Sequence, residues 1–525
     1  MNFLKRCWQR RWLRRLTWTA VTIVTLWLLL CAWMNWSGAR KWRDVQAMLK
    51  AEGVTIDFRA TMREPIPEAE NFCAIPLLKD LALVVDGDQN KGAPAEKRKR
   101  LDAAKLPLGN KGAGPRPKFG SAAHGSHLDL KAWAEWLRKE GTLPMPADSG
   151  DAAHDVLAAL SKHDGVFQEL AAGLNRPKAQ WTPEWKTREL PPNLFSIALP
   201  SHSVARAVNQ TLTLRAIAAL RAGESTKAHE TALILARLSE ASLNDPFLIA
   251  LLVGASTTGG LCGVTWELCA EHAGTAQDFA RLESALAQLD FRRATLHAFR
   301  SELAAAVDTV QYLKGARDHG YQTLFGISEG LGGDSGGMLA NLAFRAIPAG
   351  FFDANSAVLA ECEFRYFIKP LRDQGWGGAF QASKDVENEI MGMKAKIWTH
   401  PSWIMTVMIF PVTTSIIHRA AYGQTFVNQA IIACALERHR IENGNYPASL
   451  DAVKLEDGKP LPLDAMIGKP MGYRKTADGK YALWSVGRDG KDDSGKRVLN
   501  ERKPENTYFD SAEYVGDWVW DFPAK

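Results

Sequence analysis

The sequence contains none of the short motifs that identify several common classes of enzyme. There is no G-x-x-x-x-G-K-[ST], no H-E-x-x-H and no G-x-G-x-x-G at a strand–helix junction. His229-Glu230 begins the second of these motifs, but no histidine stands four residues after His229. These absences exclude a P-loop nucleotide-binding protein and a zinc protease of that type. They favour a non-enzymatic role without excluding other enzymes.

Cysteine is scarce and irregularly placed. Of the seven cysteines, five follow the N-terminal apolar segment. An odd number at irregular spacing predicts no disulfide framework. Cys262, Cys269 and His272 form a C-x6-C-x2-H pattern, but no fourth ligand lies nearby in the sequence. Their Gly- and Leu-rich helical surroundings predict buried core thiols rather than a metal site.

Outside its first residues the chain has no excess of charge of either sign. The formal net charge is +6, and hydrophobic residues make up 46% of the chain and charged residues 23%. This composition excludes a disordered chain, a collagen-like chain and a polytopic membrane protein. Residues 1–16 contain six basic side chains and no acidic one, so the remainder sums to zero. The pI of about 8.8 is therefore a property of the N-terminus, and no nucleic-acid partner is expected.

One long apolar run lies near the N-terminus. Leu16–Trp36 contains 21 residues without a charged side chain, which at 1.5 Å per residue spans roughly 31 Å, about one hydrocarbon core. Because basic residues precede it and tryptophans lie near both ends, 16–36 is predicted to cross a lipid bilayer once. The basic tail at 1–15 is then cytoplasmic, and the bulk of the chain lies on the other side. A signal peptide cleaved near Ser37-Gly38-Ala39 and a lipoprotein acylated at Cys31 are the alternatives.

The middle of the chain divides into a linker and a helical body. Residues 37–127 are predicted to form a juxtamembrane helix and then a Pro/Gly-rich linker, in which Lys97–Arg100 is a solvated stretch of charge. From 128 to 415 the pattern is helical, with helices expected at 128–141, in a hairpin at 203–240, and at 276–289 and 292–313. The uncharged stretches 247–266 and 401–417 are predicted to be buried core helices, with membrane contact as the alternative.

A string within this body resembles a serine-protease motif. Gly333–Gly337 spells G-D-S-G-G and Ala122–His124 spells A-A-H, as around the nucleophilic serine and the general-base histidine of trypsin-like proteases. That family folds as two β-barrels, whereas the residues between these two strings have helical patterns. A flexible, glycine-rich connection between helices is therefore the better interpretation.

The C-terminal residues have a different pattern, in which one helix is followed by short strands. The helix is predicted at 416–442 and ends at Asn443-Gly444, where glycine favours a left-handed cap. Strands are expected at 471–475 and 480–486 around an Asp478-Gly479 turn, with Trp518–Trp520 as a closing strand or a plug against the sheet.

This succession resembles the globular head of the major pseudopilin of type II secretion. The matching residues are ALERHRIENGNYPASL (Ala435–Leu450), Leu461–Asp464 with Gly468-Lys469-Pro470 and Tyr473, and YALWSVGRDGKDD (Tyr481–Asp493). The resemblance implies a small α+β head at 416–525 that contacts proteins and holds Ca2+ in its Asp- and Gly-rich loop. The candidate ligands here are Asp489, Asp492 and Asp493, with a backbone carbonyl near Val486. An ordinary solvated acidic turn is the alternative. The prepilin cleavage motif is missing, so polymerisation as a pilin is not expected.

The whole chain also resembles a group of single-pass envelope proteins of Verrucomicrobia-type bacteria that has no assigned activity. Matching segments are Glu70–Leu78, Leu286–Phe291, Tyr422–Val453 and the terminal GDWVW. The resemblance implies a bacterial inner-membrane protein whose bulk is periplasmic. The expected fold is mostly α, with an N-terminal transmembrane helix, an irregular α-helical body and a small pseudopilin-like α+β head with short antiparallel strands.

The leading functional hypothesis is a non-enzymatic envelope scaffold or assembly protein. Its head would dock to a protein partner that the sequence does not identify, and Ca2+ is the only cofactor considered. Two alternatives stay open. One is a periplasmic hydrolase with a site in the helical body, for example around Ser335. The other is a helical peptide- or ligand-binding module built on the hairpin at 203–240.

Overall fold

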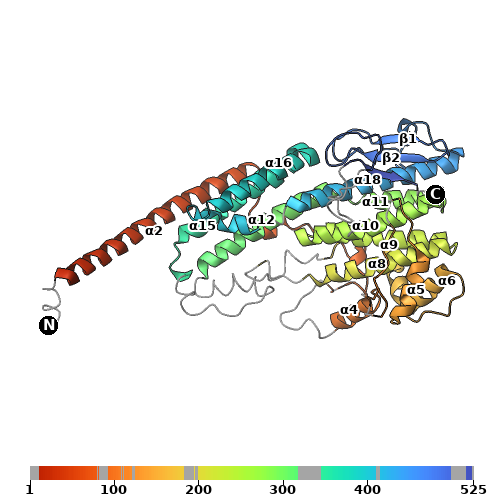
Figure 1. Ribbon diagram of the computed structural model, residues 1–525, viewed down its shortest axis with the longest axis horizontal. Helices are drawn as coiled ribbons and strands as arrows, with labels where there is room; N and C mark the ends of the chain where they lie inside the picture. Colours follow the sequence, from red (N-terminus) through yellow and green to blue (C-terminus); the bar gives the residue numbers. More distant parts are fainter. Residues whose placement is uncertain are drawn as a thin grey trace.

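The computed structural model is elongated and mostly helical, with a long helix at its N-terminal end and a three-stranded sheet near the opposite end (Figure 1). This architecture confirms the predicted fold class. The structure describes residues 11–79, 81, 93–107, 109, 112–120, 125–181, 194, 199–316, 344–409, 414–497 and 516–522.

The predicted transmembrane and juxtamembrane helices form one continuous helix, α2 (Arg11–Ala51), of 41 residues. At 1.5 Å per residue it is about 60 Å long, twice the thickness of a hydrocarbon core. Its first half is exposed and is long and apolar enough to span a membrane. The second half contacts the body, for example at Asn35, whose Oδ1 accepts a hydrogen bond from Gly350 N at 2.8 Å. The helix therefore combines an apolar span with a rod to which the body is attached.

The remaining helices form the body. They are α3 (Phe58–Thr61), α4 (Ala93–Ala103), α5 (Leu130–Glu140), α6 (Ala152–Leu160), α7 (Asp164–Ala172), α8 (Pro200–Arg221), α9 (Ser225–Leu243), α10 (Leu248–Ala270), α11 (Ala276–Leu286), α12 (Phe291–Gly315), α15 (Ala349–Glu363), α16 (Lys369–Ala395), α17 (Ile404–Ile409) and α18 (Thr414–Asn443). A five-residue π-helix, Phe364–Ile368, joins α15 to α16.

Local capping explains where several of these helices begin and end. Asp129 caps α5 by accepting from Ala132 N, and Gly141 ends that helix with a φ of 77°. Thr275 and Asp278 form a capping box at the start of α11. Asp290 caps α12. The sequence contains these signals, so the predicted helices at 128–141, 276–289 and 292–313 are confirmed to within a few residues.

Two local predictions differ from the structure. The stretch Lys97–Arg100 belongs to α4 rather than to an irregular linker, because Ala, Glu, Lys and Arg are strong helix formers and Leu101 and Ala104 are buried beside it. The stretch 401–417 is not one core helix. It begins with a 3-10 turn at Pro401–Trp403, continues in the short α17 and includes the first residues of α18.

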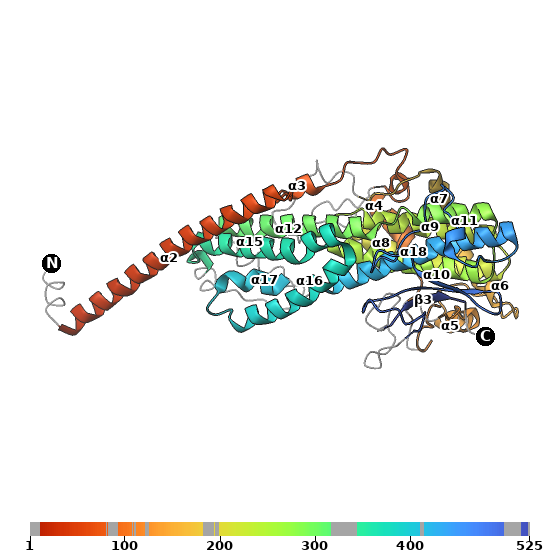
Figure 2. The same cartoon turned by 90° about the horizontal axis from the view of Figure 1, so that it is seen from above.

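The C-terminal sheet has the predicted strands. β1 (Gly472–Lys475), β2 (Tyr481–Ser485) and β3 (Trp518–Asp521) pair antiparallel in the order β1-β2-β3. A glycine turn with a φ of 81° at Gly479 joins the first two strands. The sheet lies on one side of α18 (Figure 2). Gln429 Nε2 of that helix donates to Trp518 O at 2.7 Å, so the closing strand is confirmed and its tryptophans are buried.

The head and the body share one hydrophobic core. The same cluster of buried side chains includes Trp42 of α2, Leu268 of α10, Ile432 of α18 and Trp520 of β3. The helix α18 packs against α10, α11 and α12, and Trp266 Nε1 donates to Asp521 O at 2.6 Å. The helix predicted to belong to the head is therefore also a central helix of the body.

Candidate functional site

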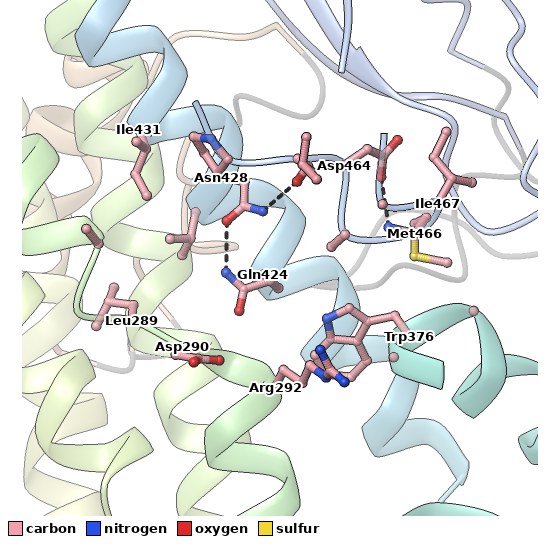
Figure 3. Close-up of a pocket in the computed structure, with 18 of the residues that line it drawn as sticks. Leu289, Asp290, Arg292, Trp376, Gln424, Asn428, Ile431, Asp464, Met466 and Ile467 are labelled. Atoms are coloured by element: carbon pink, nitrogen blue, oxygen red, sulfur yellow. Dashed lines mark hydrogen bonds between the residues drawn. The ribbon is translucent and has the colours of Figure 1, made fainter. Parts of the chain in front are cut away.

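A cleft of about 880 Å³ lies at the junction of head and body. Four segments form its walls: the corner between α11 and α12, the first turns of α16, one face of α18, and the head loop that precedes β1. Figure 3 labels its principal side chains, which are Leu289, Asp290, Arg292, Trp376, Gln424, Asn428, Ile431, Asp464, Met466 and Ile467.

A break in α16 shapes one wall of this cleft. Gly375 has a φ of 70° and a ψ of −155° inside that helix, a backbone conformation that favours glycine. The break leaves nearby carbonyl groups without helical donors. Arg292 supplies donors, since its Nε reaches Leu371 O at 3.1 Å and its Nη2 reaches Arg372 O at 2.9 Å. Arg292 and Trp376 consequently lie beside each other at the cleft (Figure 3).

A relay of amide side chains crosses the α18 wall. Gln424 Oε1 accepts from Phe291 N at 2.8 Å, and Gln424 Nε2 donates to Asn428 Oδ1 at 2.9 Å. Asn428 Nδ2 donates in turn to Leu463 O at 2.8 Å (Figure 3). This relay connects the first residue of α12 to the head loop, so it fixes the position of the head relative to the body.

Asp464 holds the head loop against the sheet. Its carboxylate accepts from Met466 N at 2.9 Å, Ser485 Oγ at 2.8 Å and Val486 N at 3.0 Å. The side chain is buried, and burial raises the pKa of Asp464 above its usual value despite these hydrogen bonds. The aspartate of the L-P-x-D segment therefore shapes the loop.

The lining provides binding groups of two kinds. Leu463 and Ile467 of the head loop are 48% and 40% exposed, which is high for large apolar residues. Charged side chains of both signs lie close to them in the lining, with Asp290 and Arg292 from the body and Lys459 from the head. Among the described residues that form the walls there is no serine, cysteine or histidine. The cleft therefore presents exposed apolar side chains together with charged groups of both signs.

The candidate Ca2+ ligands lie in the turn after β2, away from this lining. Asp489 Oδ1 accepts from Lys491 N at 3.1 Å. Asp492 Oδ1 accepts from Trp484 Nε1 at 2.9 Å and from Ser494 N at 2.8 Å. These local bonds account for Asp489 and Asp492 as turn-forming residues.

Asp517 is a neighbouring carboxylate that the sequence analysis missed. It is buried and accepts from Asp493 N at 3.2 Å and from Gly495 N at 2.7 Å. Burial raises the pKa of Asp517, and the charges of Asp492 and Asp493 add to the effect. Its only sequence signal is its position directly before Trp518. Within the described ranges no group of three or more His, Cys, Asp or Glu side chains is placed to hold a metal, so the Ca2+ loop stays a prediction.

The other candidate residues have separate outcomes. Cys262 and Cys269 are buried and burial raises the pKa of both thiols, which confirms them as core residues. Ser335 and His124 lie outside the described residues. The predicted hairpin is formed by α8 and α9, which are largely buried. One side of α9, with His229 and Leu233, lines a separate cavity of about 640 Å³.

Comparisons with family models, curated proteins and solved structures find no match to this chain. The likeness of the C-terminal region to a pseudopilin head therefore stays an expectation from the sequence.

Proposed function

We propose that this protein is a membrane-anchored scaffold or assembly factor that docks a protein partner in the cleft between its head and its body. The observation that carries the proposal is the construction of that cleft. The relay from Phe291 through Gln424 and Asn428 holds its two sides in one geometry, while Leu463 and Ile467 remain exposed. A partner would meet a preformed surface and would not have to order it, which reduces the cost of binding.

The composition of the cleft suits a protein partner. Tryptophan and arginine are enriched among residues that dominate binding energy at protein interfaces, and Trp376 and Arg292 lie together here. Apolar side chains surrounded by a charged rim are the usual anatomy of such an interface. We therefore expect the partner to pack an apolar side chain against the exposed Leu463 and Ile467 and to pair its own charges with Arg292 and Lys459.

We infer a bacterial inner-membrane location, with the first residues of α2 in the cytoplasm and the body in the periplasm. The basic N-terminus and the exposed apolar half of α2 support this orientation. So does the segment 396–409, which carries Trp398 (94% exposed) and Met408 (64% exposed). Asn355 holds it near the start of α15 through Pro401 O (3.4 Å) and Met405 N (3.1 Å). These exposed apolar side chains would rest on the bilayer surface.

A photo-crosslinking experiment on the full chain in native membranes tests the docking cleft. A photoreactive amino acid at position 467 is expected to capture one protein partner, and Leu463→Asp is expected to abolish the product. The same amino acid at position 478, in the turn between β1 and β2, is the matched control and should give no such product. Equal capture at both positions, or capture that survives Leu463→Asp, would contradict the proposal.

Orientation has its own test. Alkaline phosphatase fused after residue 525 folds only in the periplasm, so the proposed topology predicts an active fusion. Green fluorescent protein at the same position should be dark when exported unfolded. An inactive phosphatase together with fluorescence would place the body in the cytoplasm.

We also propose that Ca2+ orders the Asp-rich turn after β2, in agreement with the pseudopilin resemblance. The supporting observation is the proximity of Asp492 and Asp493 to the buried Asp517. Millimolar Ca2+ should raise the melting temperature of the protein relative to chelator, and replacing Asp489, Asp492 and Asp493 together with Asn should remove the difference. Identical melting with Ca2+ and with chelator would leave the loop an ordinary turn.

A further inference from the structure

A second cavity, of about 520 Å³, lies where the end of α2 and α3 meet the first turns of α12. Figure 2 shows α3 beside α12. The charge of its lining is one-sided. Four arginines contribute to it, against one carboxylate, that of Asp290. The arginines are Arg63, Arg292, Arg293 and Arg300.

Arg63 is held in this cavity by neutral groups. Its Nε donates to His297 Nδ1 at 3.1 Å, and its Nη1 donates to Asn244 Oδ1. His297 Nε2 donates to Thr61 O at 2.9 Å, so the imidazole is neutral with its proton on Nε2. Burial and the nearby Arg63 lower the pKa of His297 to about 4. The histidine therefore orients Arg63 and offers no negative charge to it.

Arg293 and Arg300 lie on the same face of α12, two turns apart. In the described part of the chain neither side chain has a carboxylate within ion-pair distance, and the buried Nε of Arg300 has no hydrogen-bond partner. Arg293 also stands in the first turn of α12, where the helix dipole disfavours positive charge. Burial, and then the charge of Arg293, lower the pKa of Arg63 to about 10. The charges of Asp245, Asp290 and Glu240 act on Arg63 in the opposite sense, but Asp290 is the only carboxylate among the described residues that line the cavity.

We propose that this cavity binds a small, soluble oxyanion with at least two negative charges, of the phosphomonoester or polycarboxylate class. Guanidinium groups bind such oxygens through paired hydrogen bonds, and several converging arginines favour a multiply charged anion over chloride. The volume lies within the range of small-molecule sites. Bound anion would supply the missing partner of Arg293 and Arg300.

The position of the cavity favours a soluble ligand over a lipid headgroup. Gly53, which lines it, follows Trp36 by 17 residues. Along a helix that separation is about 25 Å, so the cavity lies well above the predicted membrane surface. The site is also distinct from the docking cleft, with which it shares only Asp290 and Arg292. The proposal goes beyond the docking function and does not depend on it.

Titration of the full-length protein in lipid nanodiscs with inorganic phosphate, and separately with citrate, tests the site. At least one of these anions should bind and should raise the melting temperature, whereas sodium chloride at equal ionic strength should not. The preferred anion distinguishes the phosphate class from the polycarboxylate class. Nanodiscs of zwitterionic lipid should give the same affinity as nanodiscs with anionic lipid, because the ligand is soluble.

Three variants complete the test. Arg293→Gln and Arg300→Gln should each weaken anion binding roughly ten-fold, and Arg206→Gln, at an exposed arginine of α8, should leave it unchanged. Without anion, Arg293→Gln should raise the melting temperature, because it removes repulsion between Arg293 and the other arginines of the cavity. If Arg293 instead stabilised the fold, the same change would lower the melting temperature. Equal stabilisation by chloride, or an anion affinity unchanged in Arg293→Gln and Arg300→Gln, would overturn the proposal.

Discussion

Two helices of this protein pass the same test for a membrane span and have opposite environments. The apolar part of α2 has a mean hydropathy of 1.8 in its most apolar window and none of that window is buried in the protein. The corresponding values for α10 are 1.6 and 72% buried. Hydropathy and length alone therefore do not distinguish an anchor from a core helix. The distinction comes from their side-chain sizes and their flanking charges.

Each helix contains a threonine that donates to a carbonyl of its own helix, although Thr258 Oγ1 of α10 has no hydrogen-bond partner among the described residues. Thr22 of α2 donates to Trp18 O at 2.8 Å, and Thr265 of α10 donates to Leu261 O at 2.9 Å. The two helices differ in where glycine allows a neighbouring helix to come close. A Cβ added at Gly260 would lie 2.6 Å from Thr213 Oγ1 of α8, so α10 allows neighbouring helices to approach closely. The apolar part of α2 presents leucine and tryptophan instead, which suit contact with lipid.

The charged residues next to the two apolar stretches also differ, being buried beside α10 and solvated beside α2. The acids on either side of the uncharged stretch 247–266 are buried beside basic side chains, with Asp245 Oδ2 at 2.9 Å from His202 Nε2 and Glu267 Oε2 at 2.7 Å from Arg221 Nη2. Arginines precede α2 and can remain in water beside lipid headgroups. A charge held by a tertiary partner indicates a core helix, whereas a solvated basic cluster indicates a membrane anchor.

The largest expected effect comes from removing a tryptophan of each helix. Trp266→Ala should destabilise the protein by about 3–5 kcal/mol, because a fully buried ring is lost together with its hydrogen bond to Asp521 O. Trp27→Ala, at a residue 49% exposed, should change the stability of the body by less than about 0.5 kcal/mol. Denaturant unfolding of both variants in the same nanodiscs measures this. Similar losses would remove the distinction between the two helices.

A second test uses pH at the N-terminus of α10. Glu302 Oε1 accepts from Leu248 N at 3.1 Å, and burial raises the pKa of Glu302 to about 7. Burial, followed by the charge of Glu302, also raises the pKa of Glu363. Because the folded protein holds the proton of Glu302 more tightly than the unfolded chain, Glu302 stabilises the folded protein fully below the unfolded pKa, near 4.5. This contribution to the free energy of unfolding is lost as pH rises through the folded pKa of about 7. The loss between pH 5 and pH 8 should be at most about 3 kcal/mol.

Glu302→Gln should remove most of that pH dependence and keep the hydrogen bond to Leu248 N. Glu361→Gln is the control, at a half-exposed residue of α15 whose carboxylate lies 4.0 Å from Lys41 Nζ, and it should leave the pH profile as it is. Unfolding free energies of the three proteins between pH 5 and pH 8 provide the measurement. A wild-type protein that becomes more stable as pH rises over this range would contradict the assignment to Glu302.

Glycine substitutions probe the close packing of α10. Gly260→Ala should cost about 1–3 kcal/mol, since the added methyl group would meet Thr213 and Asn209. Gly263→Ala on the same helix meets nothing within 4 Å and should stabilise it by about 0.5–1 kcal/mol. Thermal melts of the pair give the sign of each change. If both substitutions changed the stability in the same direction, helix propensity rather than packing would determine the effect of alanine at these positions.

The smallest change in stability is expected when the predicted membrane span is removed. Residues 14–30 are exposed along their whole length, so a chain that begins at residue 31 should be water-soluble and should melt within about 2 °C of the full-length protein. Calorimetry on the shortened chain and on the nanodisc-embedded protein makes the comparison. A larger decrease would show that the span supports the body as well as anchoring it.

Local sequence rules predicted much of the fold. The apolar run, the glycine cap at Gly444 and the turn at Gly479 each depend on residues a few positions apart, and the structure has the expected elements there. The helix α4 was missed because its composition matched both a solvated linker and a helix, and only the burial of Leu101 and Ala104 favours the helix.

The binding sites were much less predictable. Asp489, Asp492 and Asp493 were singled out by resemblance, whereas Asp517 depends on a pairing between strands β2 and β3 that is distant in sequence. The docking cleft brings residues near 290, 376, 428 and 464 together. The arginine cavity joins Arg63 to residues more than 200 positions away. No local pattern marks these groups, because each belongs to a helix or loop that is ordinary by itself.

The sequence by itself determined the apolar span, the positions of most helices and the antiparallel strands, since hydrophobic periodicity, caps and turns act within a few residues. The tertiary structure alone decided that α18 belongs to the body as much as to the head, and where arginines converge. Burial and charge compensation depend on which distant segments pack together, and that is set by the shared core of the whole chain.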